Sequence, residues 1–154
     1  MGIFSRVRAL EPLERRLAVE AVLALGAAAF VVAVFSFRRI AGAATSGFSG
    51  FAGSDSERAH QVARVRWAVG ACARRVPWRA KCFEQGIAAQ WMLRRRGVPS
   101  ILHYGVAREK DGLIAHVWLT SGALEVVGCE NKGDFAELAR FPDEAPKRRR
   151  PEAG

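Results

Sequence analysis

The most pronounced apolar pattern lies near the N-terminus, where 18 of the 21 residues from Leu17 to Phe37 are apolar. Pro12 stands where helices often begin, so the pattern predicts a helix from Pro12 to Arg39. Apolar side chains surround this helix on every side except at Glu20, which is typical of a membrane span or a fully buried helix. At about 1.5 Å per residue the stretch is long enough to cross a bilayer, so its length does not separate these two structures.

Residues 42–53 are rich in Gly, Ser and Ala, the composition of a linker between an N-terminal segment at 1–41 and a domain that begins at residue 54. Ser54 and Glu57 form a helix-capping signal. Apolar residues then recur at spacings of three and four until Pro77, which predicts a second helix. These residues are Val62, Val65, Ala68, Val69 and Cys72.

A third helix is predicted from Cys82 to Arg96, because Gly97 and Pro99 stand where they commonly end helices. The pattern then changes to short β-prone runs, separated by turn residues at 108–112 and 121–122. The three predicted strands are 101–106, 113–120 and 123–127, and we expect an antiparallel meander. Helices that precede a sheet indicate an α+β fold.

Residues 133–141 are predicted to form one or two last helical turns, which closes the domain at 54–141. The residues after them, 142–154, are polar and contain Pro, so we expect a basic, disordered tail. A chain of 154 residues has room for one domain and an appendage, which excludes a multidomain enzyme.

The net charge of +9 suits nucleic acid, anionic lipid or an acidic peptide. Basic residues at 94–96 and 147–150 either attract an acidic peptide or lie at a helix end and in a solvated tail. We interpret the arginines on the second helix as a solvated flank, and we predict no nucleic-acid partner. These arginines are Arg58, Arg64, Arg66, Arg74 and Arg75.

The three cysteines, Cys72, Cys82 and Cys129, are odd in number and lack C-x-x-C spacing. This argues against a disulfide framework and against a four-ligand zinc site, so we expect a reducing compartment and no metal. Cys72 and Cys129 are interpreted as core thiols.

Cys82 is the candidate nucleophile, because the unpaired N–H groups and dipole of a helix start stabilise a thiolate. A thiolate nucleophile is commonly activated by a histidine. Of the three histidines, His60 lies in the arginine-rich helix and His103 in the first strand. We select His116 in the second strand, since a helix packed on that strand can bring sulfur and imidazole together.

A longer string of residues surrounds this pair and resembles the lasso-peptide leader peptidases, which belong to the transglutaminase-like branch of papain-like cysteine proteases. The resemblance covers residues from about 56 to 141. Its motifs are Pro77-Trp78, Cys82, Leu93 to Pro99, Gly105-Val106, Ala115-His116-Val117-Trp118 and Gly122.

The resemblance implies a transglutaminase-like (papain-like) core, with Cys82 as nucleophile, His116 as general base and no cofactor. It implies a peptidase that removes the leader from a ribosomally made precursor peptide, usually after a threonine at the leader's penultimate position. This chain has no room for the family's recognition domain. We therefore expect a separate leader-binding recognition protein, and an ATP-dependent cyclase that closes the ring.

The sequence departs from the family at the third catalytic residue, because the position of its aspartate falls on Val127. If Thr120 pairs with Ala123 across a two-residue turn, His116 faces Val127 and Glu125 becomes a diagonal neighbour. A longer loop favours Glu130 instead. Both carboxylates remain candidates, as does a dyad without a third residue.

Four arginines precede the apolar stretch and two follow it. The positive-inside rule would place the residues after 40 outside the cell, where a reduced thiol acting on a cytosolic precursor is misplaced. We therefore expect a cytoplasmic protein whose residues 17–37 dock on the peptidase, on a partner, or shallowly on a membrane. The alternative is a weakly active or inactive scaffold that presents the precursor to the cyclase. A third hypothesis, a basic protein that binds nucleic acid or a membrane surface, is supported by the net charge alone.

Overall fold

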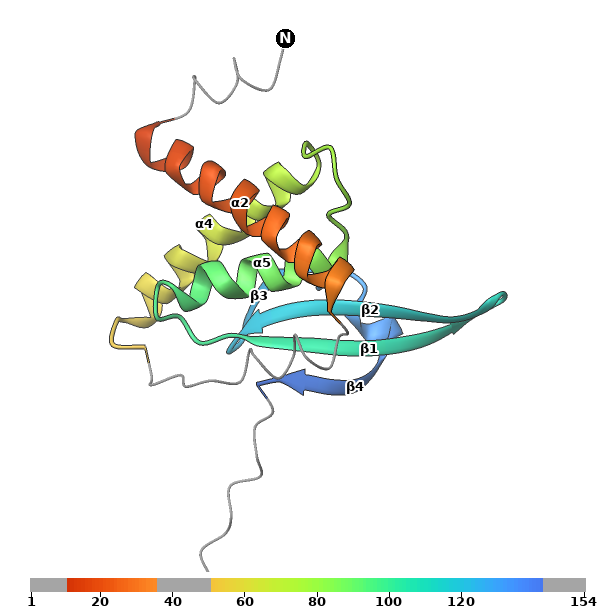
Figure 1. Cartoon of the computed structure of the whole chain (residues 1–154). Helices are drawn as coiled ribbons and strands as arrows, with labels where there is room; N and C mark the ends of the chain where they lie inside the picture. Colours follow the sequence, from red (N-terminus) through yellow and green to blue (C-terminus); the bar gives the residue numbers. More distant parts are fainter. Residues whose placement is uncertain (1–10, 36–50, 143–154) are drawn as a thin grey trace, which may run out of the picture.

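The computed structural model describes residues 11–35 and 51–142, in which three helices precede a four-stranded sheet (Figure 1). The α+β prediction is confirmed. Residues 42–50 of the predicted linker and 143–154 of the predicted tail lie outside the described residues. The elements are α2 (Pro12–Val34), α4 (Asp55–Ala73), α5 (Cys82–Arg94), β1 (Ile101–Glu109), β2 (Gly112–Ser121), β3 (Leu124–Val127), the short 3-10 helix η1 (Lys132–Asp134) and β4 (Ala136–Phe141).

Helix α2 begins at Pro12 as predicted and packs one face against α4 and α5. The opposite face is exposed, as Leu23 at 68% and Phe30 at 65% exemplify. The helix is therefore not buried on all sides, although among the described residues it has the length and hydropathy of a membrane span. Its buried face comprises Leu17, Ala18, Ala21, Leu25 and Ala28.

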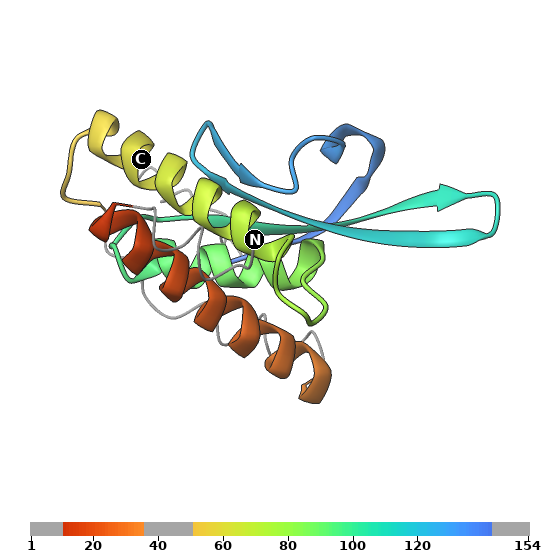
Figure 2. The same cartoon turned by 90° about the horizontal axis from the view of Figure 1, so that it is seen from above.

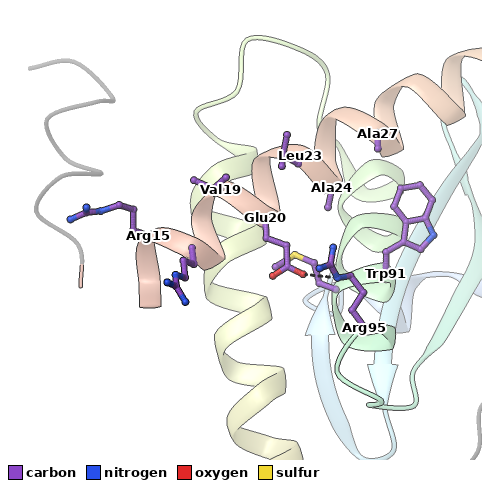
Figure 3. Close-up of a pocket in the computed structure, with 10 residues that line it drawn as sticks. Arg15, Val19, Glu20, Leu23, Ala24, Ala27, Trp91 and Arg95 are labelled. Carbon is purple, nitrogen blue, oxygen red and sulfur yellow. Dashed lines mark ion pairs between the residues drawn. The ribbon is translucent and has the colours of Figure 1, made fainter. Parts of the chain in front are cut away.

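Glu20, the one charge within the apolar stretch, forms an ion pair that ties α2 to the end of α5. Arg96 donates to both carboxylate oxygens of Glu20, at 2.9 and 2.6 Å. These hydrogen bonds and the positive charge hold the pKa of Glu20 below its ordinary value, against the opposing effect of burial. Figure 3 shows Glu20 extending toward Arg95, beside a groove of about 690 Å³ that Trp91 also lines. Glu20 therefore helps to hold α2 against the rest of the domain.

Local signals set the ends of α4 and α5. The Ser54 hydroxyl accepts from the Glu57 N–H at 3.2 Å, and the Glu57 carboxylate accepts from the Ser54 N–H at 2.6 Å, which completes a capping box. Gly97 follows α5 with a φ of +68°, and Val98 N–H donates to the Leu93 carbonyl at 3.0 Å. This pattern is a Schellman motif, which glycine favours. All five residues predicted for the core face of α4 are buried.

The sheet has the order β3-β2-β1-β4, with antiparallel neighbours throughout. Figures 1 and 2 show the helices on one face of it, while the β1–β2 hairpin projects beyond them. Helix α5 lies close to this face at Gly86, where an added Cβ would meet Leu102 at 2.7 Å and Val117 at 3.0 Å. Because side chains alternate along a strand, His116 and Trp118 point to the opposite face.

The prediction of helical turns at 133–141 is wrong for most of that segment. Only the short η1 is helical, and β4 pairs with β1, with Leu102 opposite Phe141 and Val106 opposite Ala136. The free edge of β1 offers backbone hydrogen bonds to the segment, and this tertiary pairing outweighs its local preference. Residues 128–135 therefore cross from the β3 edge of the sheet to the β4 edge.

Candidate active site

Cys82 is the first residue of α5 and is half-buried. The helix start is held by Glu84, whose carboxylate accepts a hydrogen bond from the Lys81 N–H at 3.0 Å. Glu84 is only 2% exposed and is paired with Arg79 at 3.4 Å. Its capping position, three residues after Lys81, was readable in the sequence, but its burial was not. The thiol thus sits on a fixed helix start whose first N–H groups are free of helical partners.

A cavity of about 510 Å³ opens beside this thiol, between α4, the start of α5 and the end of β3. Its wall on the β3 side is formed by Val126, Val127 and Gly128. Glu130 and Gln85 also line it. The cavity is therefore a candidate site for the substrate segment that Cys82 would attack.

His116 is positioned by the crossing segment that follows β3. Its Nε2–H donates to the carbonyl oxygen of Gly128 at 2.7 Å. Its ring lies 4.8 Å from the ring of Phe135 and 6.1 Å from that of Trp118, between ring centroids. The imidazole is therefore held from one side by a hydrogen bond and flanked by two aromatic rings.

Gly128 is the residue that relates Cys82 to His116, because it lines the cavity of the thiol and accepts the imidazole's hydrogen bond. Within the described residues, the Cys82 sulfur forms no hydrogen bond with His116. Catalytic hydrogen bonds in ligand-free sites are often long and tighten when substrate binds. The two predicted residues thus lie near the same glycine without direct contact. Because α5 packs on the face of β2 that carries Val117, and His116 points to the other face, the packing of the helix on this strand does not itself bring sulfur and imidazole together, contrary to expectation.

Neither predicted carboxylate forms an ion pair with His116 in the described part of the chain. Lys132 donates to Glu125 at 2.5 Å, and this bond lowers the pKa of the exposed Glu125 carboxyl. Glu130 lines the cavity beside Cys82. Only Glu130 of the two is therefore placed at the cavity.

The strand register differs from both turns considered for β2 and β3. Ser121 pairs with Leu124 across Gly122-Ala123, and a bulge then sets Leu119 opposite Val127. Gly122 adopts a φ of +60°, which glycine tolerates and other residues rarely do. His116 consequently faces the residues beyond the end of β3, and the Gly128 carbonyl occupies the place where a carboxylate was sought.

The other thiols lie in the core. Cys72 donates to the Ala18 carbonyl at 3.5 Å and Cys129 to the Leu119 carbonyl at 3.3 Å. Burial raises the pKa of both thiols, which disfavours thiolate. Their interpretation as core thiols is consistent with this placement. Within residues 11–35 and 51–142, no three His, Cys, Asp or Glu side chains gather as metal ligands would.

His103 has a structural environment that sequence reasoning passed over. Its ring stacks on Trp118 at 5.3 Å, with a hydrogen bond of 2.9 Å to the Thr120 hydroxyl oxygen. Burial lowers the pKa of His103, although Glu137, 3.3 Å from its Nδ1, acts in the opposite direction. Trp118 therefore lies between the imidazoles of His103 and His116. The pairing of β1 with β2 predicts this arrangement, because it sets His103 opposite Trp118.

The family model for the transglutaminase-like superfamily matches residues 22–140, more than three quarters of the chain. The match begins within α2 and ends within β4, so it includes both Cys82 and His116. Searches of curated proteins and of solved structures found no match. Together with the observed helix-then-sheet fold, this match assigns the chain to the transglutaminase-like superfamily, which includes cysteine peptidases.

Proposed function

We propose that the protein is a cysteine peptidase that removes the leader from a lasso-peptide precursor, before a separate cyclase closes the ring. One observation carries the proposal: Cys82 begins α5 in an open cavity whose wall, at Gly128, binds His116. The motifs around Cys82 and His116, which resemble the leader peptidases, and the membership of the superfamily support it.

In the proposed reaction, His116 takes the thiol proton and the Cys82 sulfur attacks the scissile carbonyl carbon. The Cys82 backbone N–H stabilises the resulting oxyanion. His116 then gives its proton to the leaving amine, the C–N bond breaks, and a thioester joins Cys82 to the leader. Water, deprotonated by His116, hydrolyses that thioester and restores the thiol. Because Gly128 holds Nε2–H, Nδ1 is the atom that exchanges the proton.

The proposed partners are the precursor peptide, a separate leader-binding recognition protein and an ATP-dependent cyclase. The chemistry needs no cofactor. We further propose that the protein is cytoplasmic and that α2 stays on the domain, because spanning a membrane would expose Ala21 and Leu25 and break the Glu20–Arg96 pair. Carbonate extraction of cell membranes tests this: release into the soluble fraction is expected, and retention contradicts it.

Mass spectrometry of a precursor mixed with the protein and the leader-binding partner tests the peptidase activity. We expect release of the leader, and loss of that release in Cys82→Ala and His116→Ala. Cys72→Ala, which removes a buried thiol away from the cavity, serves as the matched control. Cleavage that survives Cys82→Ala in a folded variant contradicts the proposal.

A scaffold without peptidase activity is the second candidate, favoured by the lack of a carboxylate at His116 and of a Cys82–His116 bond in the described residues. The pH dependence of Cys82 labelling by iodoacetamide separates the two. A catalytic thiol reacts well below pH 8, whereas a scaffold's thiol follows the ordinary pKa of about 8.5.

A further inference from the structure

The five arginines of the second predicted helix, expected to form one solvated flank, have different surroundings in the structure. Arg58 pairs with Asp55, and Arg75 at the end of α4 donates to the Ala71 carbonyl at 2.5 Å. Arg64 lines a separate groove together with Glu20, Arg95 and Arg96. The remaining two arginines, Arg66 and Arg74, line the cavity of Cys82.

Arg66 lies on α4, and Arg74 is the C-cap residue that follows this helix. Gly70 and Ala71 also line the cavity, and the Arg74 guanidinium reaches back over Gly70, 3.7 Å from where a Cβ on that glycine would lie. Trp67, 42% exposed, adds an apolar surface beside Arg66. Both guanidinium groups therefore lie along the α4 side of the cavity of Cys82.

Neither guanidinium forms an ion pair with a carboxylate among the described residues, and both side chains are exposed, although the charge of Arg66 helps to lower the pKa of Glu125. The cavity also contains one carboxylate, Glu130, so the cationic groups outnumber the anionic one. A guanidinium presents several donors in a plane that matches a carboxylate. The excess of positive charge in the cavity lining therefore favours an anionic group beside the thiol.

We propose that Arg66 and Arg74 form a subsite for a carboxylate of the substrate peptide, at an acidic residue near the bond that Cys82 attacks. The proposal rests on the peptidase function for its substrate, but the attraction of anions to Cys82 does not require catalysis. It predicts that the precursor carries Asp or Glu within a few residues of the cleavage site.

Alkylation of Cys82 by iodoacetate and by iodoacetamide measures this attraction, because the two reagents have nearly the same shape and differ in charge. In each case the sulfur forms a bond to carbon and iodide leaves. The rate of Cys82 alkylation by iodoacetate is divided by its rate with iodoacetamide. Dividing this ratio by the same ratio for N-acetylcysteine amide isolates the electrostatic effect of the groups around Cys82. Peptide mass spectrometry assigns the label to Cys82, since Cys72 and Cys129 are buried.

We expect the normalised ratio to exceed one by about threefold to tenfold at low salt, and to fall as NaCl screens the charges. The double variant Arg66→Gln/Arg74→Gln should bring it close to one. Arg64→Gln, on another face of the same helix, should leave it unchanged. A wild-type ratio near one, or an equal fall in Arg64→Gln, overturns the proposal.

Cleavage of matched peptides separates this proposal from the peptidase function. Precursors with Asp or Glu near the cleaved bond, or with Asn or Gln in their place, should differ by about tenfold in kcat/KM, and the double variant should remove the difference. Absence of all cleavage contradicts the peptidase function but leaves the alkylation result to decide the subsite. Equal cleavage of acidic and amide peptides contradicts the subsite alone.

Discussion

The Nε2 atom of His116 lies 2.7 Å from the carbonyl oxygen of Gly128, so a histidine on β2 is bound by the backbone that follows β3. A carbonyl only accepts hydrogen bonds, and Nε2 must therefore carry the proton of the neutral ring. This leaves the Nδ1 lone pair to accept the proton of a thiol. The arrangement sets the tautomer as a carboxylate would, with a neutral acceptor in its place.

We predict that neutral His116 is the Nε2–H tautomer in the intact protein. Two-dimensional NMR of ¹⁵N-labelled protein, through the two-bond couplings of the imidazole, distinguishes a protonated Nε2 from a protonated Nδ1. Comparison with His116→Gln assigns the signals. A protonated Nδ1 in the neutral ring contradicts the geometry.

Gly128→Ala should destabilise the protein more than Gly97→Ala. Both glycines have positive φ, +71° and +68°, so alanine strains the backbone at each by about 1 to 2 kcal/mol. At Gly128 an added Cβ would also lie 2.6 Å from the Val117 carbonyl oxygen, whereas nothing lies within 4 Å at Gly97. Urea unfolding should give an additional loss of about 1 to 3 kcal/mol for Gly128→Ala. Equal losses would mean that the close approach to β2 is absent.

Replacing either candidate carboxylate should leave the proposed cleavage largely intact. Glu125 is paired with Lys132, and neither it nor Glu130 forms an ion pair with His116 in the described residues. We expect Glu125→Gln and Glu130→Gln to change kcat by no more than about threefold. A loss of 100-fold or more in one variant would instead identify that residue as the third catalytic member, since removing an orienting carboxylate costs a large factor.

The Glu20–Arg96 pair should make stability depend on acid pH. The folded-state pKa of Glu20 is depressed below its ordinary value of 4.5. Its contribution is therefore fully present above pH 4.5 and is lost as the pH falls through the folded pKa. Glu20→Gln should cost about 2 kcal/mol at pH 7 and reduce the acid dependence. Urea unfolding at pH 7 and pH 4 measures both, and Glu109→Gln at the end of β1 should change neither.

Two helical glycines should respond to alanine in opposite directions. Gly86→Ala places a Cβ 2.7 Å from Leu102, so the gain in helix propensity is outweighed and we expect a loss of about 1 to 2 kcal/mol. Gly70→Ala meets only the Arg74 side chain at 3.7 Å and should gain about 0.5 to 1 kcal/mol. Thermal unfolding of the two variants tests this, and stabilisation by Gly86→Ala would contradict the close packing of α5 on the sheet.

The sequence determined the features that depend on neighbouring residues. The Ser54–Glu57 capping box, the five-residue core face of α4 and Gly97 after α5 are local signals, because each acts within one or two helical turns. Cys82 at a helix start follows from the same kind of signal. The α+β order and the β1–β2 hairpin were predictable for this reason.

Only the tertiary structure decided what depends on contacts between distant segments. Pairing with the edge of β1 made residues 136–141 a strand, and the register shift between Leu119 and Thr120 placed the Gly128 carbonyl at His116. Contact with α4 and α5 buried one face of α2 and left the other exposed. Of the five arginines assigned to the second helix, Arg66 and Arg74 line the cavity of Cys82. A local pattern encodes which residues share a face of an element. The element that will cover that face, and the register in which it binds, are set by long-range packing and backbone pairing.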